Sequence, residues 1–206
     1  MEGTKSRLIE AASQLLDSGG ESAVTLRAVA EAVGVSHNAP YRHFTDRNAL
    51  LAAVAERDLV ALSRAFRRRP PAVAKDALKT AVMHFVAYGR THPARYRLLF
   101  SGPEVCVDGG SMQDAAREAF DAFGALVAQC KRDTGAPPAD CLKLAGLIYA
   151  TVRGALDIEL SGHAKERNGL DDLGATVDLL LNFIWPPPKG VGAARNPRET
   201  LPAERL

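Results

Sequence analysis

The sequence predicts an all-α protein, in which a small N-terminal helical head is followed by a larger helical body. Apolar residues recur three and four positions apart in almost every segment that can be phased, as they do along one face of an α-helix. No segment shows the alternating pattern of a half-buried strand, and no internal repeat is found. Apolar residues make up 47% of the chain, which is enough to bury a core, so global disorder is not expected.

Residues 4–18 predict the first helix, because leucine, isoleucine and alanine repeat there on one face. The pair Gly19-Gly20 is expected to end it through a left-handed C-terminal cap. Thr25 then offers a capping hydroxyl to a second, short helix that ends near Val33.

The next elements are predicted from turn and capping residues. Gly34 permits a tight turn, and Ser36 is expected to cap a third short helix that runs through Phe44. Thr45 or Asp46 then caps a long fourth helix with apolar residues at helical intervals.

The fourth helix runs out in Arg67-Arg68-Arg69 and is ended by Pro70-Pro71. This break separates the head, together with its linking helix, from the remainder of the body. We expect the head over residues 1–50, the body over 51–185 and a disordered tail over 186–206, which is rich in small, charged and proline residues. The body beyond the boundary predicts further helices: one that ends before Pro93, then about 94–100, 111–133, 139–161 and 170–185.

Residues 24–44 read as two short helices joined by a turn at Gly34, which is a helix-turn-helix. A hairpin in a plain helical bundle would carry Glu and Lys on its outer surface. Here the second helix instead carries polar and aromatic side chains, which can read the base edges in a major groove: His37, Asn38, Tyr41, Arg42 and His43.

This part of the chain resembles the TetR/AcrR family of transcriptional regulators. The motifs that carry the resemblance are Gly34-Val35-Ser36, the run from Pro40 to Phe44, Asp46-Arg47 and Ala49-Leu50-Leu51, within a match over about residues 4–54. The resemblance implies a helix-turn-helix DNA-binding domain over residues 1–50 and a ligand-binding and dimerisation domain over 51–185. It also implies a cytoplasmic, non-enzymatic regulator, by default a repressor, with double-stranded DNA and an unidentified small-molecule effector as partners.

The same resemblance assigns roles to individual side chains. Ser36, His37, Asn38, Tyr41 and His43 take the DNA-facing positions, Thr25 and Arg27 lie where the preceding helix meets the backbone, and Arg47 gives a phosphate contact. We interpret Thr25, Tyr41, His43 and Arg47 as residues that position the duplex, His37 and Asn38 as base readers, and Arg42 as either. Each is alternatively an ordinary solvated residue.

Two other residues of this segment are interpreted structurally. Phe44 is expected in the core rather than on DNA. Pro40 lacks an amide donor, so the third helix is expected to start irregularly.

The charge of the head tempers the DNA-binding interpretation. Residues 1–50 carry five Lys and Arg against six Asp and Glu, a net charge of −1. Non-specific affinity should therefore be weak, and operator binding should depend on dimerisation. The cations at 64 and 67–69 either add long-range attraction or form a solvated helix end beside the helix dipole.

The last two long helices hold more apolar surface than one small bundle needs on a single side, so we expect them to form a four-helix homodimer interface. The apolar residues that indicate it are Leu142, Leu144, Leu147, Ile148, Val152, Leu156 and Leu160, then Leu173, Val177, Leu180, Leu181 and Ile184.

The body resembles, more weakly, a TetR C-terminal subclass with a Tyr-Arg-Leu-h-Phe motif (h, any apolar residue) before a Gly-Pro loop and a Trp-x-x-x-His-Gly motif. Residues 96–100 with Gly102-Pro103 match the first motif, whereas the second reads Tyr149 to Gly154, with Arg153 in place of histidine. Arg153 either favours an anionic effector or pairs with Asp157 one turn later. The candidate pocket residues, most of which can equally be core, are Phe85, Tyr88, Tyr96, Phe100, Phe120, Phe123, Tyr149 and Arg153.

Two other classes of protein are alternatives to a DNA-binding regulator. An enzyme is disfavoured because there is no phosphate-binding glycine loop, no Gly-x-Ser-x-Gly motif and no metal-ligand spacing among the histidines at 37, 43, 84, 92 and 163, so no cofactor or metal is expected. A helical bundle that has lost DNA recognition is the other alternative, and the near-neutral head favours it.

No segment is apolar enough to span a membrane, no signal peptide is found, and Cys106, Cys130 and Cys141 are expected to be reduced thiols.

Overall fold

The structure is a computed structural model that describes residues 3–68, 73–100, 110–134 and 140–186. Within these ranges it has eight α-helices, three short 3-10 helices and no strand, which confirms the predicted all-α class. None of these helices is long and apolar enough to cross a membrane. The predicted tail from residue 187 onward and the Gly102-Pro103 loop lie outside the described residues.

The first two helices agree with the sequence prediction to within one residue, although Gly20 ends the first with φ +69° and ψ −170° instead of the predicted left-handed cap. Helix α1 covers Thr4–Gly19 and α2 covers Leu26–Val33, with a 3-10 turn at Glu21–Ala23 between them. The Thr25 hydroxyl accepts a hydrogen bond from the Ala28 amide at 3.0 Å, and Gly34 takes the left-handed conformation with φ +73°.

The predicted third helix over residues 36–44 is wrong. The structure has a 3-10 helix at Pro40–Arg42, and the flanking bonds also span three residues: Ala39 N to Ser36 O at 2.9 Å and His43 N to Pro40 O at 2.9 Å. Pro40 has no amide hydrogen for the Ser36 carbonyl, so the α-helical bond between these two residues cannot form. Proline therefore holds this segment in tight turns instead of a regular helix.

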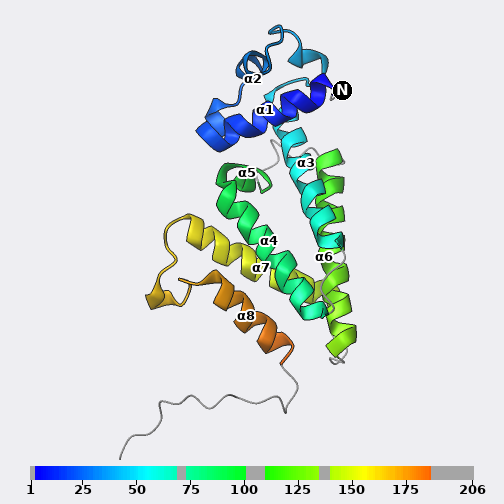
Figure 1. The fold of residues 1–206 in the computed structure, drawn as a ribbon, viewed down its shortest axis with the longest axis vertical. Coiled ribbons are helices and arrows are strands. Elements are labelled where there is room, and N and C mark those ends of the chain that lie inside the picture. The colour runs from blue at the N-terminus through cyan, green and yellow to red at the C-terminus, as the bar shows by residue number, and fades with distance from the viewer. Residues whose placement is uncertain (1–2, 69–72, 101–109, 135–139, 187–206) are drawn as a thin grey trace, which may run out of the picture.

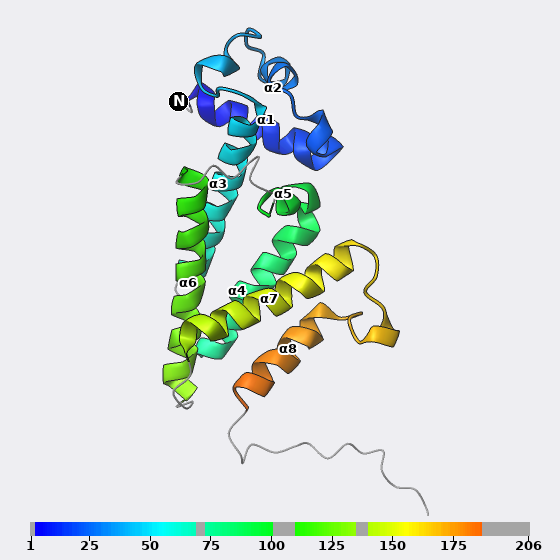
Figure 2. The same ribbon diagram turned by 180° about the vertical axis from the view of Figure 1, so that it is seen from behind.

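Helix α3, Arg47–Arg67, connects the head to the body and packs along α6, Ser111–Thr134 (Figures 1 and 2). Of the two predicted caps, Asp46 is the one used: its carboxylate accepts a hydrogen bond from the Ala49 amide at 2.8 Å. The apolar positions of its stripe, Leu50, Leu51, Val54 and Leu62, are buried as expected.

The body adds α4 (Ala74–Thr91), α5 (Pro93–Leu98), α7 (Cys141–Leu160) and α8 (Leu173–Ile184). Figure 1 places the short α5 directly beneath α1, while α7 and α8 form the lower end. Helix α8 starts three residues later than predicted, because Asp172 caps it and Gly169 takes a left-handed turn before it. One continuous hydrophobic cluster runs from Leu8 to Trp185, so the division at residue 50 stays a prediction.

Candidate nucleic-acid interface and internal cavity

The segment after α2 presents its polar side chains to solvent. Together with α2 it forms the end of the molecule farthest from α8 (Figure 1). The Tyr41 side chain is 61% exposed, and the other candidates of this segment are exposed as well: Ser36, His37, Asn38, Arg42 and His43. Pro40 and Phe44 are buried and anchor the segment, which confirms the core position predicted for Phe44.

Two candidates lie at the start of α2. Thr25 is exposed and caps the helix, and Arg27, two residues further, is exposed as well. Neither Arg27 nor Arg42 forms an ion pair within the part of the chain that the structure describes. These two guanidinium groups therefore supply the positive charge of the candidate surface despite the negative net charge of the head.

Arg47 has partners inside the head. Its Nε donates to the Val24 carbonyl at 2.7 Å, and its guanidinium pairs with the Glu21 carboxylate at 3.2 Å. These bonds tie the start of α3 to the segment before α2. The Arg47 side chain is only 36% exposed. Its contact with a phosphate stays a prediction.

A cluster of charged side chains joins the head to the body, and we call it the junction cluster: Asp17, Asp58, Tyr88, His92 and Arg95. Asp58, on α3, is buried and accepts hydrogen bonds from Arg95 Nε and from the Tyr88 hydroxyl, both at 2.8 Å. Asp17, on α1, binds Arg95 Nη1 at 3.2 Å and His92 Nδ1 at 2.9 Å. Arg95 thus holds one carboxylate from the head and one from the linking helix.

The junction cluster also shifts the acidity of its members. Burial raises the pKa of the Tyr88 hydroxyl above its ordinary value, and the charge of Asp58 adds to the rise. Burial alone would lower the pKa of Arg95, but the hydrogen bond and charge of Asp58 outweigh it and raise that pKa. Both shifts favour the protonated forms, so Arg95 stays cationic and Tyr88 stays neutral beside the carboxyl groups of Asp17 and Asp58.

The sequence analysis missed this cluster, although one signal was present. Asp58 falls between Val54 and Leu62 on the buried stripe of α3, four residues from each. A carboxylate at such a position requires a buried partner.

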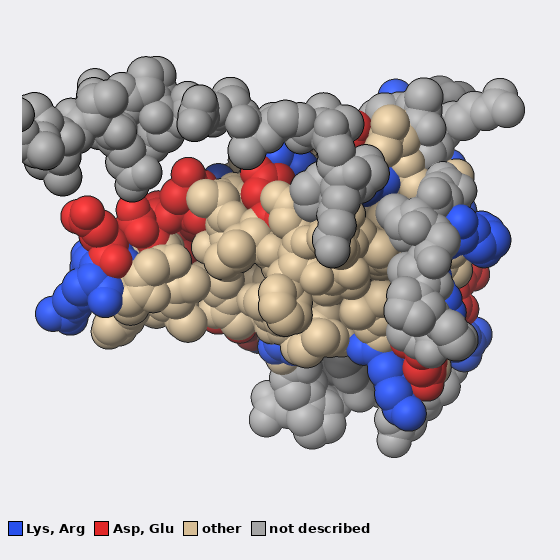
Figure 3. Space-filling view, turned by 90° about the horizontal axis from the view of Figure 1, so that it is seen from below, with Lys and Arg blue, Asp and Glu red and all other residues tan. Residues whose placement is uncertain are grey.

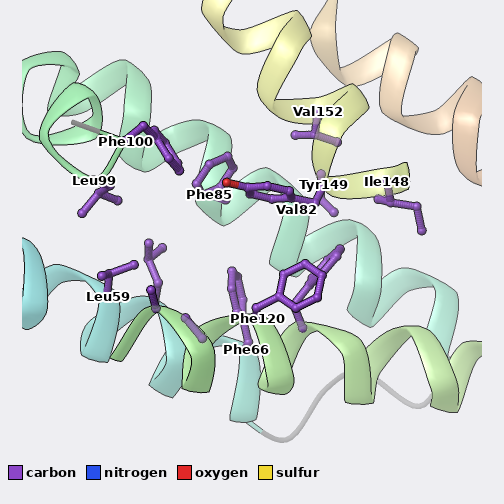
Figure 4. Close-up of a pocket in the computed structure, with 14 residues that line it drawn as sticks. Leu59, Phe66, Val82, Phe85, Leu99, Phe100, Phe120, Ile148, Tyr149 and Val152 are labelled. Atoms are coloured by element: carbon purple, nitrogen blue, oxygen red, sulfur yellow. The ribbon is translucent and has the colours of Figure 1, made fainter. Parts of the chain in front are cut away.

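The body contains a partly open cavity of about 230 Å³ between α3, α4, α6, α7 and the residues that follow α5 (Figure 4). Five of the predicted pocket residues line it: Phe85, Phe100, Phe120, Phe123 and Tyr149. The other lining residues were not predicted as pocket residues, and two of them, Ile148 and Val152, were expected at the dimer interface, because apolar helix faces look alike whether they line a cavity, an interface or a closed core. These residues are Leu59, Leu62, Phe66, Val82, Leu99, Ala116, Ala119, Ile148 and Val152.

Three predicted pocket residues do not line the cavity. Tyr88 turns its hydroxyl to Asp58, and the buried Tyr96 donates its hydroxyl to Asp157 at 2.8 Å. Arg153 lies with its guanidinium 3.9 Å from the centre of the Phe100 ring, and its Nε is 3.7 Å from Asp157. Of the two interpretations of Arg153, the pairing with Asp157 is the one observed.

The lower face carries unpaired apolar side chains on α7 and α8. Phe183 is 85% and Leu179 73% exposed, and Leu142, Leu147 and Ile158 are exposed beside polar neighbours. Figure 3 shows a broad uncharged surface here with charged residues at its ends. Several residues named for the predicted interface, among them Ile148, Leu156 and Leu181, are instead buried within the chain.

Comparison with known families gives two matches. The model described as "Bacterial regulatory proteins, tetR family" matches residues 8–54. The model described as "Tetracyclin repressor-like, C-terminal domain" matches residues 78–184, about half of the chain. No match was found among curated proteins.

Solved structures share the fold at low sequence identity. A protein of unknown function from Rhodococcus sp. RHA1 superposes with a TM-score of 0.76 at 23% identity, covering 90% of this chain and 97% of that one. The fatty acid degradation regulator FadR from Bacillus halodurans gives 0.65 at 16% identity, covering 95% and 98%. A TetR transcriptional regulator from Rhodococcus sp. RHA1 gives 0.57 at 20% identity, covering 85% and 94%.

Proposed function

This chain belongs to the TetR family of DNA-binding transcriptional regulators, a non-enzymatic family, and we propose that it represses transcription by binding a palindromic operator as an effector-responsive homodimer. The observation that carries the proposal is the segment from Ser36 to Phe44, in which two buried residues, Pro40 and Phe44, hold six exposed polar or aromatic side chains. We propose the division into a DNA-binding domain over residues 1–50 and an effector-binding and dimerisation domain over 51–185.

The head contacts the duplex through two groups of side chains. Thr25, Tyr41 and His43 position it on the phosphates, while His37 and Asn38 meet base edges. Asparagine can pair bidentately with adenine, and the exposure of Asn38 leaves its amide available for this. Arg27 and Arg42 add phosphate contacts, since both are exposed and neither pairs with an acid of the described chain. Arg47 reaches a phosphate with the exposed part of its guanidinium.

The dimer is formed by the exposed apolar face of α7 and α8. Leu179 and Phe183 lie one helical turn apart on α8, and both are largely exposed in the single chain. Contiguous apolar surface of this kind marks an interaction site. A two-fold axis through this face would present two heads to two half-sites of one operator.

The cavity is the effector site, and the junction cluster carries its effect to the head. Leu59 lines the cavity and directly follows Asp58, so a displacement of α3 by an effector moves the carboxylate that holds Arg95. By thermodynamic linkage, the effector lowers operator affinity by the same factor by which the operator lowers effector affinity.

Selection from random duplex DNA at moderate salt tests the operator proposal. We expect a palindromic consensus, whose half-site spacing reports the separation of the two heads. No enrichment by a folded dimer would contradict sequence-specific binding and favour a bundle without DNA recognition.

Tyr41→Ala then separates a DNA contact from a structural role. Because Tyr41 is 61% exposed, we expect the melting temperature to stay unchanged while operator affinity falls by about tenfold or more, the loss of one or two contacts. Tyr41→Phe keeps the ring and isolates the hydroxyl contact. A lowered melting temperature with unchanged affinity would make Tyr41 a structural residue.

The oligomeric state is tested by Leu179→Glu with Phe183→Glu. We expect a dimeric mass for the unaltered protein at micromolar concentration and a monomeric mass for the double variant, measured by light scattering. Thr80→Glu, on the exposed face of α4, is the control and should stay dimeric. A monomeric unaltered protein would contradict the dimer.

A further inference from the structure

We propose that the effector is an uncharged molecule of one or two rings with a single polar group directed at Tyr149. This inference rests on the effector role of the cavity proposed above and adds the chemical class of the molecule. It follows from three properties of the cavity: its aromatic walls, its single hydroxyl and the pairing of the charges around it.

Six of the 14 residues that line the cavity are aromatic, and two pairs of their rings meet edge to face. Phe120 meets Tyr149 with centroids 5.9 Å apart and planes at 83°, and Phe85 meets Phe100 at 6.4 Å and 75°. Phe66 and Phe123 approach each other at 5.9 Å on the α3 and α6 side. A flat ring placed among these side chains makes the same edge-to-face and offset contacts, which add to the gain from burying apolar surface.

Tyr149 supplies the single polar side chain among the residues that line the cavity. Figure 4 shows its hydroxyl as the one oxygen drawn, close to Phe85. Burial raises the pKa of this hydroxyl, and the nearby Arg153 offsets part of the rise. A neutral phenol both donates and accepts a hydrogen bond, so it suits an amide, hydroxyl or carbonyl group of a neutral molecule.

Within the described residues, the guanidinium that lies against the cavity wall has an acidic partner. Arg153 lies over the Phe100 ring and beside Asp157, and Asp157 also accepts the Tyr96 hydroxyl. A carboxylate in the cavity would have to compete with Asp157 and with the Tyr149 hydroxyl for the Arg153 guanidinium, and an ammonium would have to compete with Arg153 and Tyr96 for Asp157. Either charge would otherwise be buried among apolar side chains without a counter-ion, which is strongly unfavourable.

The size of the cavity limits the molecule. Its volume of about 230 Å³ equals that of about eight water molecules in the liquid. We expect a flat fused two-ring molecule to fill a volume of this size and an extended chain to have to fold within it.

Isothermal titration calorimetry of the full-length protein with three probes tests the inference. The amide 2-naphthamide and the anion 2-naphthoate have nearly the same shape and differ in charge, and decanamide carries the same amide on an open chain. We expect 2-naphthamide to bind at least tenfold more tightly than either of the other two. Equal or tighter binding of 2-naphthoate or decanamide overturns the inference, as does the absence of binding by all three probes.

Two variants test whether 2-naphthamide binds in the cavity. Ala119 lines the cavity from α6, so Ala119→Phe fills it and should lower the affinity for 2-naphthamide at least tenfold. If that variant does not fold, the smaller Ala116→Leu fills the same space. Undiminished affinity in the folded variant overturns the assignment. Arg153→Gln should change the ratio of amide to carboxylate affinity less than about threefold, and a larger change overturns the conclusion that Arg153 is unavailable to ligands.

Operator binding distinguishes this inference from the function on which it rests. If 2-naphthamide binds in the cavity but leaves operator affinity unchanged, the ligand class stands and the coupling fails. If 2-naphthoate both binds more tightly and releases the operator, the coupling stands and the ligand class fails.

Discussion

The cavity and the junction cluster lie side by side and are chemically opposite. The cavity is walled by aromatic and aliphatic side chains with one hydroxyl, whereas the junction cluster joins two carboxylates, a guanidinium, an imidazole and a phenol. Apolar walls bind a molecule by its shape and buried surface, because the hydrophobic effect has no preferred direction. Hydrogen-bonded charges hold a geometry, because small displacements break directional bonds. In the proposed function, the cavity supplies the occupied volume and the junction cluster passes its effect to the head.

Neighbouring residues connect the two regions. Tyr88 lies three residues after Phe85 on α4, and Tyr96 directly follows Arg95 on α5. The Tyr96 ring packs against Phe85 at 5.8 Å and Phe100 at 5.1 Å, both of which line the cavity. A change in the position of these rings therefore moves the backbone that carries Arg95. The predictions below test this division of roles, from the largest expected effect to the smallest.

Asp58→Ala should have the largest effect on stability. It leaves the guanidinium of Arg95, only 12% exposed, without its main partner, and removal of one member of a buried ion pair costs about 3–5 kcal/mol. We expect a loss near the lower end, since Asp17 remains, measured by urea unfolding. The control is Glu159→Gln, which removes the more exposed pair with Arg90 and should cost less than about 1 kcal/mol. Similar losses for both variants would show that burial does not set the strength of the junction.

Gly89→Ala should disturb the contact between the two regions. A Cβ at Gly89 would lie 2.7 Å from Leu156 Cδ2 and 3.1 Å from Tyr96 Cδ2, and both side chains are fully buried. Such overpacking costs about 1–3 kcal/mol, and it should also lower probe binding in the cavity. Gly124→Ala on α6 meets nothing within 4 Å and should instead stabilise the helix by up to about 1 kcal/mol. A stabilising Gly89→Ala would contradict the close approach of α4 to α5 and α7.

Asp17→Asn should change coupling more than stability. Asp17 is 30% exposed and contributes one arm of the cluster, so a loss of about 1 kcal/mol or less is expected on unfolding. The drop in operator affinity caused by a cavity ligand should shrink several-fold, measured by titration of operator DNA with and without 2-naphthamide. Glu10→Gln removes another acid of α1, whose partner Arg57 lies on α3 rather than α5, and should leave the coupling unchanged. Unchanged coupling in Asp17→Asn would exclude the junction cluster as the connection.

The raised pKa of Tyr88 predicts a small loss of stability at high pH. A folded-state pKa above the unfolded value near 10 means that the unfolded chain ionises first, so stability is full below pH 10 and falls as pH rises above it. The difference in unfolding free energy between the unaltered protein and Tyr88→Phe should narrow by roughly 1 kcal/mol from pH 10 to 11. A constant difference across this range would show that Tyr88 ionises normally when folded.

Local sequence determined the helix boundaries and the family. Thr25, Gly34 and Asp46 act within one turn of their own positions, so their capping roles are visible without the remainder of the fold. The motif from Gly34 to Leu51 likewise lies in one continuous stretch, which the family match over residues 8–54 confirms. The predicted regular third helix is wrong for a local reason too, because Pro40 has no amide hydrogen to bond the Ser36 carbonyl.

Tertiary structure decided which apolar residues surround a cavity and which charged residues meet. Phe123 and Tyr96 both lie on apolar faces of helices, yet one lines the cavity and the other does not. Helical spacing shows which face turns inward, but the space left between inward faces depends on how five separate segments pack. Asp17, Asp58 and Arg95 are far apart along the chain, and their pairing depends on the same packing. Periodicity acts over a few residues, whereas cavities and buried ion pairs arise from contacts between distant segments.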